Sequence, residues 1–292
     1  IYTLMYFINQ VMKVSGNSGD VNQLILKTGM HCLLTIHILI VYHLVLKKKN
    51  KLVLCPGLPR SGTTTLWHML KEANILNAPC KEPHFLTVLS NDKTDSPTFF
   101  PKEFKKRYHE YVYKLNIENL NVKPPYTLDI YKRYIQEYSY DFSQSYWYIS
   151  EDYLRDIKKS LSDFDIKVIL LYREPVQRLY SFCNLVCKEW SLDFSPIELY
   201  HKFLDSDDCR FLYPLLYHKY VKVFDNLICL KTETFFSSKD EQERLLQFLD
   251  LSSVDLRSMH LNKSNVCNDL NDDDVHIGKQ KLKPSYDFYS LL

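Results

Sequence analysis

Residues 57–64 combine two glycines, a cation and several hydroxyl groups in a pattern that could bind phosphate. Gly57 and Gly62 have the spacing of a P-loop, in which a lysine and then a serine or threonine follow the second glycine. Thr64 supplies the hydroxyl group, but Thr63 stands where a P-loop has its lysine. The pattern therefore predicts an anion site that differs from the site of an ordinary nucleoside triphosphatase.

A second stretch, residues 167–182, places cations and a hydroxyl group after an apolar run. Arg173 follows the run, Pro175 turns the chain, and Arg178 and Ser181 lie in the helix predicted next. In a P-loop triphosphatase the corresponding strand ends on an aspartate that holds Mg²⁺, whereas an arginine at that place binds an anion directly. Two anion sites at two strand ends suit a nucleotide with phosphate groups on both ends of its ribose.

The elements that would position these residues follow from the apolar pattern. Residues 51–55 are an apolar run closed by Pro56 and Gly57, which predicts a buried strand, and residues 63–73 have apolar side chains at helical spacing. The amide groups at the start of such a helix, together with its dipole, favour an anion. The alternative is a plain β–α turn that needs its glycines for backbone geometry alone.

Composition limits the other classes of function. The chain has 292 residues, of which 46% are hydrophobic, and it can bury a full core. A formal net charge of +2 creates no broad basic surface, so we expect no nucleic-acid partner. The eight cysteines lack the paired CxxC spacing of a zinc site, so we expect no metal, and their disulfide pattern stays open.

The first 50 residues differ from the rest and form an N-terminal segment of uncertain structure. Residues 29–46 carry no formal charge and, at 18 residues, reach the lower limit for a membrane-spanning helix. Two interpretations remain, a membrane anchor at 29–46 or a buried or irregular helix. Residues 51–292 are predicted to form a single folded domain.

The two loops resemble those of sulfotransferases that use 3′-phosphoadenosine 5′-phosphosulfate (PAPS) as co-substrate. "PRSGTTTL", residues 59–66, resembles their 5′-phosphosulfate loop, and "REPVQRLYS", residues 173–181, resembles their 3′-phosphate motif. The resemblance covers about residues 51–255 and implies an α/β fold, with a mostly parallel central sheet flanked by helices in the three-layer sandwich of P-loop nucleotide hydrolases. It implies that the donor is bound by Arg60, Ser61, Gly62, Thr63, Thr64, Thr65, Arg173 and Ser181, and that Lys279 in "HIGKQKLKPS" closes over it as part of a C-terminal loop.

A third stretch, "KEPHFL" at residues 81–86, resembles the Glu-x-His-Phe segment of heparan-type glycan sulfotransferases of the Golgi. This resemblance makes Glu82 the candidate base, with His84 either supporting Glu82 or acting as the base itself, and Arg60 stabilising the leaving group. Residues 141–148 depart from the related segment, because Phe142 replaces its lysine and Gln144 its proline.

The predicted function is transfer of a sulfuryl group from PAPS to an acceptor hydroxyl group, with a glycan as the expected acceptor. The predicted location is the Golgi membrane with residues 51–292 as a lumenal sulfotransferase domain, and the alternative location is the cytoplasm. Two other functions stay open, a P-loop nucleotide kinase and an inactive sulfotransferase-like binding protein. Residues 87–140 are expected to cover the acceptor cleft, and the acidic residues 268–274 to form a solvated turn.

Overall fold

The computed structural model describes residues 49–90, 127–190, 194–205, 212–252 and 269–292, together with Ile36, Val254 and Leu256. Residues 50–292 form one compact unit. The anchor predicted at 29–46 lies outside the described residues apart from Ile36. Among the residues that the structure does describe, no helix has the length and apolarity needed to cross a membrane.

The central sheet has four parallel strands, in the order β2-β1-β3-β4. They are β1 (Asn50–Leu54), β2 (Tyr140–Asp141), β3 (Phe164–Tyr172) and β4 (Asn226–Lys231). The apolar runs that predicted strands at 51–55 and 167–172 coincide with β1 and most of β3. The predicted α/β class with a parallel central sheet is therefore confirmed.

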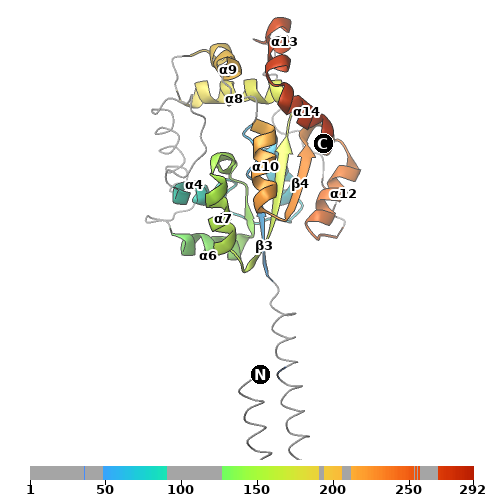
Figure 1. Cartoon of the computed structure of the whole chain (residues 1–292). Coiled ribbons are helices and arrows are strands. Elements are labelled where there is room, and N and C mark those ends of the chain that lie inside the picture. Colours follow the sequence, from blue (N-terminus) through green and yellow to red (C-terminus); the bar gives the residue numbers. More distant parts are fainter. Residues whose placement is uncertain are drawn as a thin grey trace, which may run out of the picture. The chain divides into compact units, whose positions relative to one another are not determined.

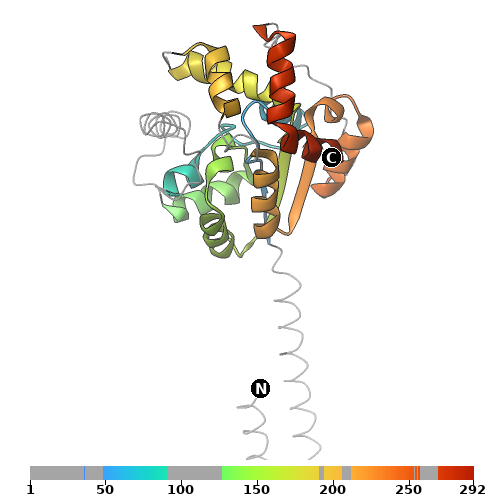
Figure 2. The same ribbon diagram turned by 45° about the horizontal axis from the view of Figure 1, so that its top comes forward.

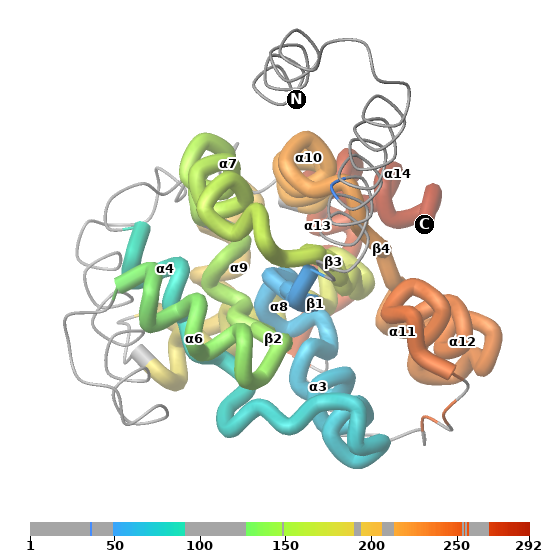
Figure 3. Tube along the Cα trace, turned by 90° about the horizontal axis from the view of Figure 1, so that it is seen from below, coloured from blue at the N-terminus to red at the C-terminus, as the bar shows by residue number. Residues whose placement is uncertain are grey.

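Successive strand side chains point to opposite faces of the sheet, and each face is covered by helices. Leu52 and Leu54 face a core built with α4 (Phe85–Ser90), α6 (Leu128–Tyr138), α7 (Glu151–Ser160) and α10 (Leu212–Val223). Val53 and Cys55 face a second core built with α3 (Thr63–Glu72) and α12 (Lys239–Phe248). Seen from below, α7 and α10 lie on one side of the strands and α3 on the other (Figure 3). The domain is a three-layer sandwich.

A further group of helices lies at the carboxyl ends of the strands, above the arrowheads in Figures 1 and 2. They are α8 (Pro175–Trp190), α9 (Pro196–Asp205), α13 (Asp272–Lys281) and α14 (Lys283–Leu291). The start of α8 is fixed locally, because Pro175 is its first residue and the Glu174 side chain accepts a hydrogen bond of 2.7 Å from the Gln177 amide. These helices pack around a third apolar cluster.

The strand order predicts where a ligand binds. From β1 the chain continues to β2 on one side, and from β3 it continues to β4 on the other side. The loops after β1 and β3 therefore leave neighbouring strands in opposite directions, and ligands bind at such a point in sheets of this kind. Both predicted anion-binding loops begin at this point.

Two local expectations are corrected, and the expected cover of the acceptor cleft is described only in part. Residues 272–274, expected in a solvated turn, instead form the first turn of α13. Asn271 and Asp274 cap this helix with a reciprocal capping box. The stretch around Lys279 is helical, and Gly278 packs against Tyr200, so no loop is present there. Within 87–140, residues 91–126 lie outside the described residues, whereas α6 buries Tyr131 and Ile135 in the core and leads into the unpredicted strand β2.

Candidate active site

The loop after β1 is shaped by neighbours that leave no room for a side chain at Gly62. This residue has a φ of 88°, and a Cβ atom there would lie 2.9 Å from Phe236 Cε2 and 3.0 Å from Thr232 Cγ2. Thr232 also donates a hydrogen bond of 2.7 Å to the Ser61 carbonyl oxygen. Because Thr232 begins α11 (Thr232–Phe235) after β4, the end of β4 forms a wall of the loop.

Backbone strain is concentrated at two of the predicted site residues. Five described residues other than glycine have positive φ, namely Arg60, Asn74, His84, Ser139 and Asp250. Asn74, Ser139 and Asp250 follow the ends of α3, α6 and α12, where a left-handed residue is an ordinary way to end a helix. Arg60, with φ 69°, and His84, with φ 54°, have no such local reason. Strain of this kind, held in place by the surrounding structure, is typical of functional sites.

The hydroxyl groups of the loop have different surroundings. The Ser61 hydroxyl is fully buried and has no hydrogen-bond partner among the residues that the structure describes, which makes it a donor available to a bound anion. Thr63 is 1% exposed, and its Oγ1 accepts a hydrogen bond from Gln144 Nε2. Thr64 is half-buried and Thr65 is buried. These residues and the first amide groups of α3 lie together at the start of the helix, where an anion is favoured, and their role in binding the donor stays a prediction.

The second predicted anion site meets the first through a direct contact. Arg60 Nε, from the loop after β1, donates a hydrogen bond of 2.8 Å to Ser181 Oγ on α8. Burial lowers the pKa of Arg60, and the positive charge of Arg173 lowers it further. The two guanidinium groups are therefore close enough to repel each other, and a bound anion would relieve this repulsion.

Arg178 adds a buried cation to the same helix. It is 3% exposed, and its guanidinium carbon lies 5.5 Å from the centre of the Tyr213 ring. In the described part of the chain, no group forms a hydrogen bond with its Nε. Residues three apart on a helix share one face, so Arg178 and Ser181 lie on the same side of α8.

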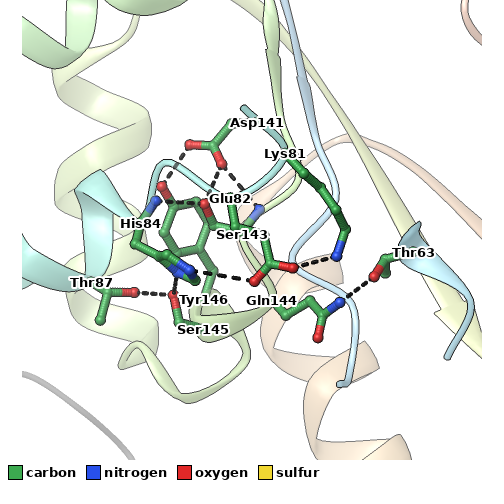
Figure 4. A network of polar contacts seen from close by, with 10 residues as sticks. All are labelled: Thr63, Lys81, Glu82, His84, Thr87, Asp141, Ser143, Gln144, Ser145 and Tyr146. Carbon is green, nitrogen blue, oxygen red and sulfur yellow. Dashed lines mark hydrogen bonds and ion pairs between the residues drawn. The ribbon is translucent and has the colours of Figure 1, made fainter. Parts of the chain in front are cut away.

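The residues predicted for proton transfer form one network, drawn in Figure 4. Glu82 Oε1 is paired with Lys81 Nζ, and Glu82 Oε2 lies 3.4 Å from His84 Nε2. His84 Nδ1 is hydrogen-bonded to Ser145 Oγ at 2.7 Å, and Ser145 Oγ is hydrogen-bonded to Thr87 Oγ1 at 2.5 Å. The structure thus brings Glu82 and His84 together in one network.

His84 is neutral at physiological pH. Burial lowers the pKa of its imidazole to about 4, although the carboxylate of Glu82 acts in the opposite direction. A neutral ring can accept the proton of Ser145 at Nδ1 and present an N–H group to Glu82 from Nε2. Only 3% of the His84 side chain is exposed, against 26% for Glu82, so Glu82 is the more accessible of the two.

The sequence did not predict the role of Asp141, at the end of β2. Its carboxylate is 1% exposed and accepts four hydrogen bonds, from the hydroxyl groups of Tyr131, Ser143 and Tyr146 and from the Ser143 amide. Burial raises its pKa to about 6, and the four hydrogen bonds oppose this rise. Phe142, which stands where the related segment has lysine, is fully buried in the core.

Two other carboxylates stand at strand ends, and both have partners. Glu174, after β3, accepts hydrogen bonds from the Gln177 amide and the Tyr286 hydroxyl group. Glu233, after β4, accepts them from the Glu174 amide and the Tyr289 hydroxyl group. Burial raises the pKa of Glu174, and Lys279 is among the groups that oppose this rise. Lys279 thus acts electrostatically on the loop after β3 from the surface of α13.

Comparisons with known proteins give the following results. No family model matches the chain, and no curated protein matches it. Twelve chains of solved structures are similar to it, and three of them are described here. A sulfotransferase from Alicyclobacillus acidocaldarius is 16% identical over 80% of this chain and 96% of its own, with a TM-score of 0.46. The sulfotransferase domain of the Synechococcus PCC 7002 olefin synthase is 18% identical over 80% and 87%, with a TM-score of 0.42. Sulfotransferase STF9 from Mycobacterium avium is 15% identical over 88% and 80%, with a TM-score of 0.43.

Proposed function

We propose that the chain is a sulfotransferase that transfers the sulfuryl group of PAPS to a hydroxyl group of a glycan. The observation that carries this proposal is the 2.8 Å hydrogen bond between Arg60 Nε and Ser181 Oγ. It joins the loop after β1 to the helix after β3 in one site that has donors for an anion at both ends. PAPS has negative groups at its 3′ and 5′ positions and so matches a two-ended site of this kind.

In the proposed reaction the acceptor oxygen forms a bond to sulfur while the bond between sulfur and the 5′-phosphate oxygen breaks. Glu82 accepts the proton of the acceptor hydroxyl group. Arg60, the Ser61 hydroxyl group and the amide groups at the start of α3 stabilise the negative charge that develops on the 5′-phosphate. Arg173 and Ser181 hold the 3′-phosphate, so that the sulfur atom and the acceptor oxygen stay aligned.

The roles of Glu82 and His84 follow from their exposure and contacts. Glu82 is the more exposed residue and is held by Lys81 on one side and His84 on the other. His84 is buried, and both of its ring nitrogens face other protein groups. We therefore assign the proton-accepting role to Glu82 and a positioning role to His84. A carboxylate base suits a sugar hydroxyl group, which is a weak nucleophile.

The competing function, a P-loop kinase, needs Mg²⁺ and residues to hold it. Thr63 replaces the P-loop lysine, and the carboxylates of Asp141 and Glu174 at the strand ends are occupied by hydrogen bonds from the protein. These contacts favour a reaction that proceeds without a metal ion.

The test is an assay of the whole chain with sulfur-labelled PAPS and a panel of glycans, phenols, steroids and tyrosine peptides. We expect label to be transferred to a glycan, at a rate that EDTA leaves unchanged. Transfer of phosphate from labelled ATP that EDTA abolishes would establish the kinase instead. PAPS binding in calorimetry without transfer to any acceptor would favour an inactive binding protein.

A further inference from the structure

Residues 141–146 connect the two halves of the candidate site. On one side they hold the segment that carries Glu82, because Ser143 Oγ accepts a hydrogen bond of 2.8 Å from the His84 amide and Tyr146 Oη accepts one of 3.2 Å from the Leu86 amide. Ser145 contributes the contact to the His84 ring at 2.7 Å. Three residues of this short segment therefore fix the position of the proposed base.

The segment is itself anchored by Asp141. Ser143 and Tyr146 each donate a hydrogen bond of 2.6 Å to the Asp141 carboxylate. A buried carboxylate with this many donors fixes the backbone around it, because each lost hydrogen bond would leave a buried polar group without a partner. Gln144 lies between these two anchored residues and begins the short helix η1 (Gln144–Tyr148).

Gln144 points away from its neighbours and toward the donor loop, as Figure 4 shows. Its Nε2 donates a hydrogen bond to Oγ1 of Thr63, the first residue of α3. The orientation of Thr63 is set from its other side, because a Cβ atom on Gly57 would lie only 3.0 Å from Thr63 Cγ2. Because Gly57 has no side chain, the Thr63 methyl group can lie against it, and the Thr63 hydroxyl group then faces Gln144.

We propose that Gln144 is a positioning residue that orients the Thr63 hydroxyl group toward the 5′ end of the donor. A hydroxyl group has a single proton to donate. Because Thr63 Oγ1 accepts a hydrogen bond from Gln144 Nε2, the Thr63 proton points away from Gln144. Thr63 begins α3, and in the proposed function, on which this inference rests, the 5′-phosphate of the donor binds at the N-terminus of this helix. The same side chain links the donor loop to the anchored segment that holds Glu82.

The experiment compares two nucleotides that differ only at the 5′ end. Adenosine 3′,5′-bisphosphate and adenosine 3′-phosphate are titrated into the chain by calorimetry, and the ratio of their dissociation constants measures what the 5′-phosphate contributes. We expect Gln144→Ala and Thr63→Val each to lower the preference for the bisphosphate about 10-fold, the usual effect of removing a hydrogen bond to a charged group. Thr63→Val keeps the methyl group beside Gly57 and removes only the hydroxyl group.

The double variant decides whether Gln144 acts through Thr63. If it does, Gln144→Ala combined with Thr63→Val lowers the ratio no further than Thr63→Val alone. Gln144→Glu can only accept from Thr63, and it should lower the ratio more than Gln144→Ala does. Gln247→Ala, an exposed glutamine on α12, is the matched control and should leave the ratio unchanged.

Failure of this inference and failure of the proposed function give different results. Equal loss of affinity for both nucleotides in Gln144→Ala, or additive effects in the double variant, would overturn the positioning role. A Gln144→Glu chain that keeps the wild-type ratio would overturn it as well. A wild-type chain that binds neither nucleotide would instead refute the proposed function.

Discussion

The ends of β2 and β3 hold their charged residues in opposite ways. At the end of β2, Asp141 is buried and accepts four hydrogen bonds from neighbouring protein groups. After β3, Arg173 is partly exposed, and its contact with the Gln177 side chain is long, at 3.4 Å. Among the described residues, Asp141 has hydrogen-bond partners for both of its oxygens, whereas most N–H groups of the Arg173 side chain have none and can donate to a ligand.

The same contrast extends to the groups around these two residues. The base region, residues 81–87 together with 141–146, is a continuous network of hydrogen bonds and ion pairs (Figure 4). The arginine region consists of Arg60, Arg173, Arg178 and Ser181. Arg60 and Arg173 repel each other, and Arg178 Nε has no hydrogen-bond partner within the described ranges. We infer that the base region is organised before any substrate binds, and that the arginine region is completed by an anion.

The largest expected effect tests the base region. Glu82→Gln keeps the shape of the side chain and removes its negative charge, so turnover should fall by about 10²- to 10⁴-fold while the affinity for PAPS changes little. The measurement is kcat with saturating PAPS, together with calorimetry of PAPS binding. Glu243→Gln, at an exposed position on α12, is the matched control. Near-normal turnover in Glu82→Gln would remove Glu82 as the base.

The second prediction uses the opposite pKa shifts of His84 and Asp141. Burial lowers the pKa of His84 from 6.5 to about 4 and raises that of Asp141 from 3.8 to about 6. As pH falls from 6 to 4, an unfolded chain protonates His84 more readily than the folded chain does, which destabilises the fold. Over the same range the folded chain protonates Asp141 more readily than the unfolded chain does, which stabilises it.

His84→Gln should therefore change the pH dependence of stability. Without His84, the free energy of unfolding should rise relative to the wild type as pH falls from 6 to 4, by up to about 1.4 kcal/mol per pH unit. Urea unfolding at several pH values measures this difference. Parallel curves for the two chains would show that His84 is not held neutral in the fold.

The sequence predicted those parts of the site that are local in the chain. The glycine loop and the Arg173 to Ser181 motif each join a strand to a helix within about ten residues, so their patterns could be recognised directly. Glu82 and His84 also lie within one short motif, so the pair could be predicted from the sequence as well. Whether these residues perform the proposed roles stays a prediction.

The rest depends on contacts that no local pattern encodes. β2 has two residues, too few for alternation to be visible, and the partners of Asp141 include Tyr131, ten residues earlier. Thr232 and Phe236, which enclose Gly62, are about 170 residues away in the chain. Gln144 was noticed as a departure from a known segment, but only the fold shows that it faces Thr63.

The third prediction concerns Arg60, where the two regions meet. Its loss should lower turnover at saturating PAPS by about 100-fold, because it would no longer stabilise charge on the leaving 5′-phosphate. It should also weaken binding of adenosine 3′,5′-bisphosphate by about 10-fold, because Arg60 reaches Ser181 at the other end of the site. Arg60→Ala is measured against Arg155→Ala, a 49% exposed arginine on α7. Unchanged turnover would place Arg60 outside the chemistry.

The smallest expected effect isolates the arginine region. Arg173→Gln removes the charge and keeps a polar side chain of moderate length, so affinity for adenosine 3′,5′-bisphosphate should fall by about 10-fold. Affinity for adenosine 5′-phosphate, which lacks the 3′ group, should change less than twofold. The loss of bisphosphate affinity caused by Arg173→Gln should be smaller at high salt, because ions screen the attraction between exposed charges.

Equal weakening for both nucleotides in Arg173→Gln would mean that Arg173 does not recognise the 3′-phosphate. The contrast between the two regions would then rest on Arg60, Arg178 and Ser181 alone.

A thermal unfolding curve for Arg173→Gln adds a second check on the contrast between the two regions. A side chain with few partners in the ligand-free protein contributes little to its stability, so the midpoint of thermal unfolding should stay within about 2 °C of the wild type. Added adenosine 3′,5′-bisphosphate should raise that midpoint more in the wild type than in the variant, because stabilisation by a ligand follows its affinity for the folded chain.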